Sequence, residues 1–344
     1  MRSALLCPHP AAFISGGNLY NERLLSALQG TDMDLEPLMW KTGEENHRLE
    51  NFDWVLVDSL YLNKIEPARF AQLSLGRRFG LLCHYIPDME TWSDAKSEEV
   101  GQRWGWLHDT FDFLVVPSPF VRRQMNDLLG FEGPIYVIPP ILGRGPDWRL
   151  KRAPGPLWAL MAANLTPLKG LLPLLEALDA ASAEPLQDQL EFTIFGSSSI
   201  DPSYAEACKR TIEGSNALLG TVRILPPIDP VDLSSVYGLA DVYVSSSFFE
   251  TFGMAVCEAL LHGTPVLAYS AGNVPGLLKE TAGGECFDSH EALATALLER
   301  SRDPEAWLPR KAKLWADRPR HLYTQKAVKE KWRRMLEQEQ AALK

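Results

Sequence analysis

The sequence predicts an α/β protein built from two doubly wound domains. Short apolar segments alternate with longer amphipathic segments in two successive runs that cover most of the 344 residues. This alternation is typical of parallel strands joined by helices. A stretch dense in Gly and Pro, residues 143–156, separates the two runs and is expected to be the interdomain linker.

The first domain is expected to span residues 1–148. Its strand segments are rich in β-branched and aromatic residues, whereas its helical segments have apolar residues at helical spacing. The expected strands are 4–7, 54–57, 80–83, 114–117 and 135–138, and the expected helices are 18–28, 67–75 and 119–129.

The second domain is expected to span residues 149–319. Its expected strands are 157–162, 192–195, 223–225, 241–245 and 265–268, and the helix 254–261 follows the fourth of them. Two doubly wound domains place the carboxyl ends of their strands around one cleft, where ligands are expected to bind.

The segment 247–258 is the most informative part of the chain. Phe252-Gly253 forms a natural turn into the helix, and free backbone N–H groups at a helix N-terminus suit a phosphate. Glu250 precedes the helix and Glu258 lies about a turn inside it. Carboxylates only accept hydrogen bonds, so these two fit the hydroxyls of a hexose and a ribose. For either glutamate alone, a solvated surface position is the alternative.

The spacing Glu250-x7-Glu258 around Phe252-Gly253-Met254 resembles the signature of the retaining GT-B glycosyltransferases of the large family-four group. The resemblance covers most of the chain from residue 157 to about 303, and it includes the segments 165–170, 240–244, 262–268 and 283–288. It implies two Rossmann-like domains that face a central cleft. The first would be the acceptor side, completed by a C-terminal helix at about 320–344, and the second would bind the nucleotide sugar.

The resemblance further implies a hexosyltransferase. A hexose would move from a UDP- or GDP-linked sugar to an acceptor hydroxyl with retention of anomeric configuration, without a metal ion or other cofactor. The departing phosphate would help to take the acceptor proton in a front-face reaction. The implied catalytic residues are His84, Lys169 and Glu250, of which Lys169 would neutralise the leaving diphosphate. The implied donor-binding residues are Gly16, Gly17, Asn164, Lys169, Ile228, Glu250, Phe252, Gly253, Met254, Ala255 and Glu258.

Two positions depart from the pattern that the resemblance implies. Asn164 stands five residues before Lys169, where the family usually has an arginine, so one of two cationic contacts to the leaving group is lost. Gly276 stands where the family has a glutamate.

The first domain offers its own candidates at the ends of its strands. Gly16 and Gly17 open a helix after the first strand, where the backbone can approach a phosphate, although a plain turn also needs glycine. Asn18 is either an acceptor contact or the N-cap of that helix. His84 can donate to a sugar hydroxyl or a phosphate, or it is a structural histidine. The other acceptor candidates are Tyr85 and Trp92, and for Trp92 packing against the core is the alternative.

Charge and composition restrict the partners. The chain carries 34 Lys and Arg against 44 Asp and Glu, so nucleic acid is not expected as a ligand. The expected partners are a nucleotide sugar and a small-molecule or glycan acceptor. Five cysteines lack paired or metal-ligand spacing, which indicates buried thiols in a reducing cytoplasm. The start of the chain does not resemble a secretory signal, and no apolar run reaches membrane-span length.

A basic segment near the C-terminus allows one membrane hypothesis. Val328, Trp332, Met335 and Leu336 recur at helical spacing, and the stripe either docks on a membrane surface or packs against the core. Membrane association is possible but not favoured.

Other functional classes remain open from the sequence alone. They are a GT-B epimerase or phosphorylase, a non-catalytic nucleotide-sugar-binding protein, and a membrane-associated lipid glycosyltransferase. Glu250 as a covalent nucleophile is a weaker mechanistic alternative. The sequence does not specify the oligomeric state.

Overall fold

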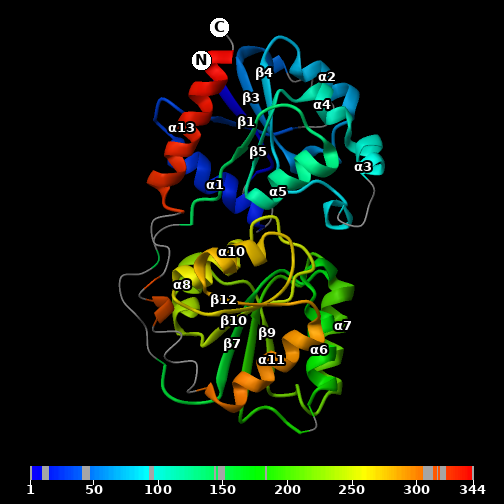
Figure 1. Cartoon of the computed structure of the whole chain (residues 1–344), viewed down its shortest axis with the longest axis vertical. Coiled ribbons are helices and arrows are strands. Elements are labelled where there is room, and N and C mark those ends of the chain that lie inside the picture. The colour runs from blue at the N-terminus through cyan, green and yellow to red at the C-terminus, as the bar shows by residue number, and fades with distance from the viewer. Residues whose placement is uncertain are drawn as a thin grey trace. The chain divides into compact units, whose positions relative to one another are not determined.

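A computed structural model describes residues 2–9, 15–40, 47–92, 97–142, 145, 152–182, 184–304, 313–315, 317 and 323–342. The chain divides into two compact units, the first formed by Met1–Gly143 with His321–Lys344 and the second by Arg144–Arg320 (Figure 1). The boundary falls slightly before the expected position between residues 148 and 149. The expected central cleft stays a prediction.

The first unit contains a parallel sheet of six strands in the order β2-β1-β3-β4-β5-β6. Its strands are β1 (Ser3–Leu6), β2 (Glu36–Leu38), β3 (Trp54–Asp58), β4 (Arg78–Leu82), β5 (Phe113–Val116) and β6 (Ile135–Val137). Strands of a parallel sheet are covered on both faces, so they consist of nearly continuous apolar runs. Strand β3 shows this, because all five of its residues are buried.

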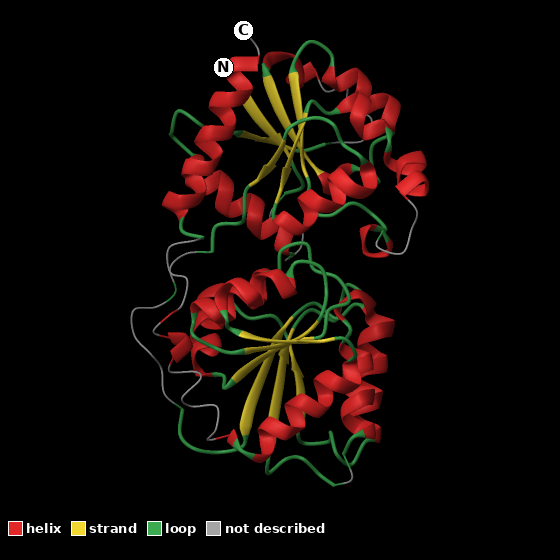
Figure 2. Ribbon diagram, in the orientation of Figure 1, coloured by secondary structure: helices red, strands yellow, loops and turns green. Residues whose placement is uncertain are grey.

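Helices cover both faces of the first sheet (Figure 2). They are α1 (Gly16–Leu28), α2 (Pro67–Ser74), α3 (Ser97–Trp104), α4 (Trp106–Thr110), α5 (Pro119–Gln124) and α13 (Gln325–Ala342). A π-helical turn at Met125–Leu129 continues α5, and 3₁₀ turns occupy His47–Asn51, Ser59–Tyr61 and Met89–Thr91.

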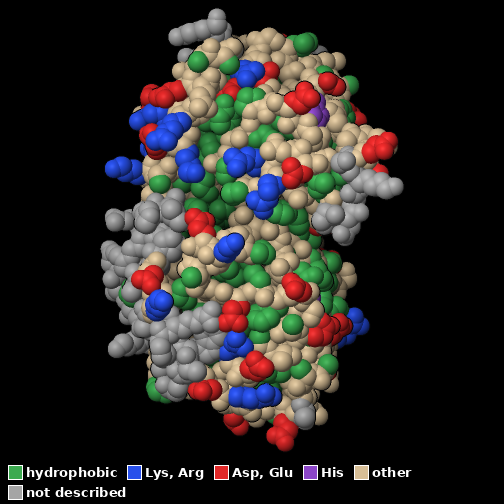
Figure 3. Space-filling model, in the orientation of Figure 1, with side chains coloured by type: hydrophobic (Ala, Val, Ile, Leu, Met, Phe, Trp, Pro, Cys, Tyr) green, Lys and Arg blue, Asp and Glu red, His purple; other side chains and the backbone are tan. Residues whose placement is uncertain are grey.

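Helix α13 completes the core of the first unit. Its apolar stripe, consisting of Val328, Trp332, Met335 and Leu336, is buried in the same cluster as Trp54 and Phe113. The stripe is therefore core-facing and is not available to a membrane surface. On the face drawn in Figure 3, Lys and Arg side chains interspersed with acidic ones lie over α13. Among the described residues, no helix is both long enough and apolar enough to cross a membrane.

The second unit contains another parallel sheet of six strands, in the order β12-β11-β10-β7-β8-β9. Its strands are β7 (Leu157–Ala162), β8 (Leu190–Phe195), β9 (Val222–Leu225), β10 (Val242–Ser245), β11 (Val266–Tyr269) and β12 (Gly284–Phe287). Its helices are α6 (Leu171–Ala180), α7 (Pro202–Gly214), α8 (Pro230–Leu239), α9 (Met254–Leu261), α10 (Val274–Thr281) and α11 (His290–Arg302). The predicted α/β fold of two doubly wound sheets is confirmed.

The strand order of each sheet reverses at one point, which defines a topological switch point. In the first sheet β1 lies beside β3, and in the second sheet β7 lies beside β10. At each of these pairs, the connection from one strand runs to one side of the sheet and the connection from the other strand runs to the opposite side. Doubly wound proteins usually bind ligands in the crevice that this creates at the carboxyl ends of the two strands. Except for Ile228, which follows β9, the predicted site residues of each unit follow these strands or their neighbours.

Candidate active site

The turn between β10 and α9 is built as the sequence predicts. Helix α9 begins at Met254 and ends at Leu261, in agreement with the expected bounds. Gly253 precedes it with φ 87°, a left-handed conformation that favours glycine. Phe252 is buried, whereas Met254 and Ala255 are half-buried in the first turn of the helix. The backbone of this segment is therefore fixed next to a helix N-terminus.

A second loop, which follows β11, clamps the turn. The backbone N–H of Asn273 donates to the Glu250 carbonyl, and its side-chain Nδ2 donates to the Phe252 carbonyl, each at 2.9 Å. A Cβ on Gly272 would lie 2.1 Å from the Glu250 carbonyl oxygen, so only glycine fits there. These non-local contacts hold the Glu250 backbone in place.

Lys169 is brought to Glu250 by the loop between β7 and α6. The Ser246 hydroxyl donates to the Lys169 carbonyl at 2.8 Å, and the Phe248 N–H donates to the Leu168 carbonyl at 2.9 Å. The Lys169 Nζ then lies 2.6 Å from Glu250 Oε1, with about a quarter of each side chain exposed (29% and 19%). Lys169 and Glu250, which were predicted to contact different parts of one sugar-nucleotide donor, thus form an ion pair with each other.

His290 supports the same pair of loops from α11. Its Nε2 lies 2.8 Å from the Ser246 carbonyl, and its ring stacks on Tyr269 with centroids 4.6 Å apart. A Cβ on Gly170 would lie 2.8 Å from His290 Nε2. His290 therefore fills the space behind the Lys169 loop.

Glu258 lies on α9, where it accepts a hydrogen bond of 3.3 Å from the buried Tyr237 hydroxyl. Burial raises the pKa of Tyr243, a hydrogen bond with Ala162 opposes the shift, and the Glu250 and Glu258 carboxylates add to it. Both carboxylates therefore add to the electrostatic environment of Tyr243 in β10. Both glutamates are half-buried, so each keeps some exposed surface.

Asn164 lies in the loop after β7 and Ile228 in the loop after β9, and β8 separates these two strands in the sheet. The Asn164 Oδ1 accepts a hydrogen bond of 3.3 Å from the Ser197 N–H, so this side chain ties two loops together. Ile228 is half-buried in the loop after β9. The predicted ligand contacts of both residues stay predictions.

The first unit gathers a second cluster of predicted residues. Helix α1 begins at Gly16, so Gly16 and Gly17 form its first turn and are not part of a preceding loop. The N-cap is Ser15, whose Oγ accepts from the Asn18 N–H at 3.2 Å, so the expectation that Asn18 is the cap is wrong. A Cβ on Gly17 would lie 3.1 Å from the His84 ring, so glycine lets the helix approach that ring.

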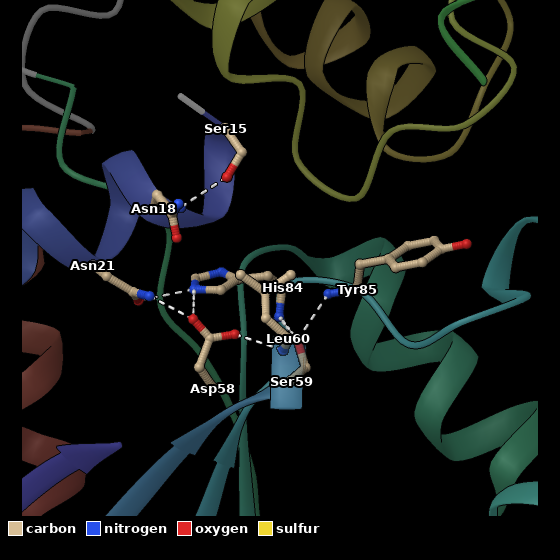
Figure 4. Close-up of polar contacts among 8 residues, drawn as sticks. All are labelled: Ser15, Asn18, Asn21, Asp58, Ser59, Leu60, His84 and Tyr85. Atoms are coloured by element: carbon tan, nitrogen blue, oxygen red, sulfur yellow. Dashed lines mark hydrogen bonds and ion pairs between the residues drawn. The ribbon is translucent and has the colours of Figure 1, made fainter. Parts of the chain in front are cut away.

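His84 is buried at the end of β4 and contacts Asn21 and Asp58 (Figure 4). Its Nε2 lies 2.9 Å from Asn21 Oδ1 and 3.7 Å from Asp58 Oδ2. Burial lowers the pKa of His84 below its ordinary value, and the Asp58 charge only partly offsets this effect. The ring is therefore neutral at neutral pH.

The two aromatic acceptor candidates differ in position. Tyr85 is half-buried, its hydroxyl donates to Glu90, and it points away from the His84 cluster (Figure 4). Trp92 is 2% exposed and belongs to the largest fully buried side chains of the described chain. Its burial supports the packing alternative, because the indole has little surface left for a ligand, and we do not include it in the proposed site.

Several residues at both clusters were missed by the sequence analysis. Asp58 directly ends a strand beside the switch point, a signal that could have identified it. Asn21 lies one helical turn after Asn18 but carries no motif of its own. The contacts of Gly272, Asn273 and His290 are non-local, so no sequence signal points to them.

Comparison with solved structures identifies the fold. A sucrose-phosphate synthase from Thermosynechococcus elongatus is 19% identical with a TM-score of 0.75, and the match covers 99% of this chain and 100% of that one. The Anabaena protein HepE, solved with UDP and glucose, is 14% identical with a TM-score of 0.71 and coverage of 98% and 100%. The chain has the GT-B fold that these glycosyltransferases share.

Sequence comparison gives a match to one family. Residues 147–313, within the second unit, match the family described as "Glycosyl transferases group 1". A D-inositol 3-phosphate glycosyltransferase from Acidothermus cellulolyticus is 29% identical over 206 residues, which is 56% of this chain and 46% of that protein. The Corynebacterium glutamicum protein of the same name is 34% identical over 143 residues, 39% and 33% of the two chains. The chain thus spans less than half the length of these curated relatives.

Proposed function

We propose that this protein transfers a hexose from a nucleoside-diphosphate sugar to an acceptor hydroxyl, with retention of anomeric configuration and without a metal ion. The observation that carries the proposal is the Lys169–Glu250 pair on a clamped turn before the N-terminus of α9. The Lys169 ammonium can pair with a diphosphate, and the Glu250 and Glu258 carboxylates can accept hydrogen bonds from sugar hydroxyls. The backbone N–H groups at the start of α9 can donate to phosphate oxygens. The match of residues 147–313 to the group 1 glycosyltransferase family and the position at a switch point support the same assignment.

The proposed chemistry needs charge stabilisation more than a nucleophile. The bond between the anomeric carbon and the diphosphate oxygen breaks, the acceptor oxygen bonds to the same face, and its proton passes to the departing phosphate. Lys169 would neutralise the diphosphate charge as it develops, while Glu250 and Glu258 orient the sugar and the ribose. Glu250 is a poor nucleophile in this arrangement because its Oε1 is held by Lys169 at 2.6 Å.

UDP-linked sugars are the first donors to test, because HepE was solved with UDP-glucose. The names of the relatives make an inositol phosphate the first acceptor to test. The purified protein is mixed with UDP-glucose or its GDP analogue and with an inositol phosphate or glycan acceptor. Acceptor-dependent release of nucleoside diphosphate is expected, also in the presence of EDTA, and the product should keep the α-configuration of the donor by NMR. Inversion, or a strict requirement for added metal, would contradict the mechanism.

A non-catalytic nucleotide-sugar-binding protein is the second candidate. It is favoured by Asn164, which takes the place of a cationic contact and has its amide oxygen engaged by Ser197. This candidate predicts saturable binding of UDP-glucose by calorimetry without release of UDP for any acceptor.

A further inference from the structure

Three residues of the first unit form a chain of polar contacts that ends at His84. Asp58 closes β3, Asn21 lies in α1, and His84 follows β4, so three elements around the switch point contribute one residue each. Figure 4 shows Asn21 and Asp58 converging on the same edge of the His84 ring. All three side chains are buried, Asp58 and Asn21 completely.

The Asp58 carboxylate fixes the orientation of the Asn21 amide. Its Oδ1 accepts from the Leu60 N–H at 2.8 Å, and its Oδ2 accepts from Asn21 Nδ2 at 2.5 Å. A carboxylate only accepts hydrogen bonds, so the NH₂ end of the amide must face Asp58. The carbonyl end, Oδ1, is then left to face His84.

The orientation of the amide in turn fixes the tautomer of His84. Asn21 Oδ1 lies 2.9 Å from Nε2 and can only accept, so Nε2 must carry the hydrogen. A neutral ring with a hydrogen on Nε2 has a bare lone pair on Nδ1. The described residues provide no hydrogen bond to that atom.

The ring is also held in position by contacts that do not involve its nitrogens. The backbone N–H of His84 donates to Ser59 Oγ at 3.0 Å. Tyr20 packs edge-on against the ring with centroids 4.9 Å apart, and Gly17 leaves room for the ring under the first turn of α1. The direction of the Nδ1 lone pair is therefore set by the fold before any ligand binds.

We propose that Asp58 and Asn21 are positioning residues that make His84 a hydrogen-bond acceptor, through Nδ1, for a hydroxyl of the donor sugar or of the acceptor. This inference rests on the proposed function. It differs from the expectation that His84 donates to a ligand, because the hydrogen on Nε2 is already used by Asn21. The Nδ1 lone pair needs a hydrogen-bond donor, which a hydroxyl provides. A phosphate oxygen is itself an acceptor, so Nδ1 favours a hydroxyl over a phosphate. The lowered pKa of His84 supports the neutral ring.

The variant Asp58→Asn keeps the contacts among residues 58, 21 and 84 but exchanges the donor and the acceptor in the contacts that Asn21 makes. The new side chain can still accept from the Leu60 N–H, but its NH₂ replaces Oδ2 and must donate to Asn21. The Asn21 amide then turns, its NH₂ faces His84, and Nε2 becomes the acceptor. The hydrogen is therefore expected to move from Nε2 to Nδ1.

Long-range ¹H–¹⁵N NMR spectra of the full chain distinguish the two tautomers. The His84 signals are identified by their loss in His84→Gln. At neutral pH we expect the hydrogen on Nε2 in the wild type and on Nδ1 in Asp58→Asn. The matched control is Asp34→Asn, the same change at an exposed turn, where Asp34 accepts from the Gly30 N–H, and it should keep the wild-type spectrum. A hydrogen on Nδ1 in the wild type, or a doubly protonated ring, would overturn the tautomer assignment even if Asp58→Asn does not fold.

Ligand additions to the wild type test the partner of Nδ1. A shift of the Nδ1 resonance with UDP-glucose but not with UDP assigns a donor-sugar hydroxyl. A shift only after an inositol phosphate is added with UDP assigns an acceptor hydroxyl. An equal shift with inorganic phosphate or UDP alone, or no shift with any of these ligands, would refute the proposed contact. The tautomer spectra need no turnover, so failure of the transferase proposal and failure of this inference are distinguishable.

Discussion

At the scale of single residues, the candidate donor site is organised by an ion pair between two side chains that are 81 positions apart in the sequence. Lys169 and Glu250 were each predicted as ligand contacts, and the structure places them 2.6 Å apart. Neither motif predicts this pairing, because the sequence does not reveal how the loops after β7 and β10 meet. The pair keeps both charges compensated until a donor competes for them.

We expect Glu250→Gln to separate binding from turnover. Without the carboxylate, Lys169 is freer to bind a diphosphate, and a partly exposed pair of this kind is worth about 1 kcal/mol at most. UDP affinity by calorimetry should therefore rise by no more than about fivefold, while sugar transfer falls at least about tenfold. The control is Glu280→Gln, an exposed glutamate at the end of α10. Wild-type turnover in Glu250→Gln would argue against its role.

The burial of His84 predicts how stability depends on pH. Because the pKa of His84 is lowered from 6.5 in the folded chain, the unfolded chain binds a proton that the folded chain excludes. Stability is therefore complete above about pH 6.5 and is lost as the pH falls from there through the folded-state pKa. Denaturant titrations at two pH values on either side of 6.5 should show a smaller acid loss for His84→Gln than for the wild type. Equal losses in both proteins would exclude His84 as the cause.

At the scale of secondary-structure elements, most strands of the described chain could be predicted because their periodicities are local signals, whereas the sequence analysis assigned no range to helices α3, α4, α6, α7, α8, α10 and α11. Helix 254–261 and strand 157–162 match the expected bounds. The two strands that were missed, β2 and β12, are sheet edges only three and four residues long. Their sequences, Glu-Pro-Leu and Gly-Glu-Cys-Phe, carry Pro or Gly, which usually indicate turns.

The loop after β11 is an element whose role emerged only from the structure. Asn273→Ala removes the side-chain donor to the Phe252 carbonyl, at an expected cost of about 1 kcal/mol in the free energy of unfolding. Asn273→Asp should be worse, because it places a carboxylate against the carbonyl. Transfer rates should fall in the order wild type, Ala, Asp. Equal activity and stability for the three proteins would show that the clamp does not matter.

At the scale of the whole molecule, the chain closes its first unit with its last helix. Glu339 of α13 is 1% exposed, lies 2.7 Å from Arg78 Nε, and accepts a hydrogen bond of 2.7 Å from the Tyr136 hydroxyl. The sequence indicated the apolar stripe of α13, but a buried glutamate pairing with a residue 261 positions away carries no local signal. The ends of the chain are thus joined in one core.

We expect Glu339→Gln to destabilise the first unit selectively. The substitution keeps the shape but removes the charge that compensates Arg78, which retains Asp112 at 2.9 Å. The expected loss is about 2 kcal/mol, below the usual cost of breaking a buried pair, because Arg78 keeps this second partner. Denaturant unfolding should show a shift in one of two transitions. The control is Glu330→Gln, an exposed partner of Arg334 on the same helix, which should change stability by no more than about 0.5 kcal/mol.

We propose that the turn before α9, together with Lys169, binds and activates a nucleotide sugar. The most direct measurement is the rate of acceptor-dependent sugar transfer by purified, folded wild-type, Lys169→Ala and Glu258→Ala proteins. The proposed roles predict losses of at least about tenfold for each variant, equivalent to about 1.4 kcal/mol of transition-state stabilisation. Near-wild-type transfer by both variants would contradict the account.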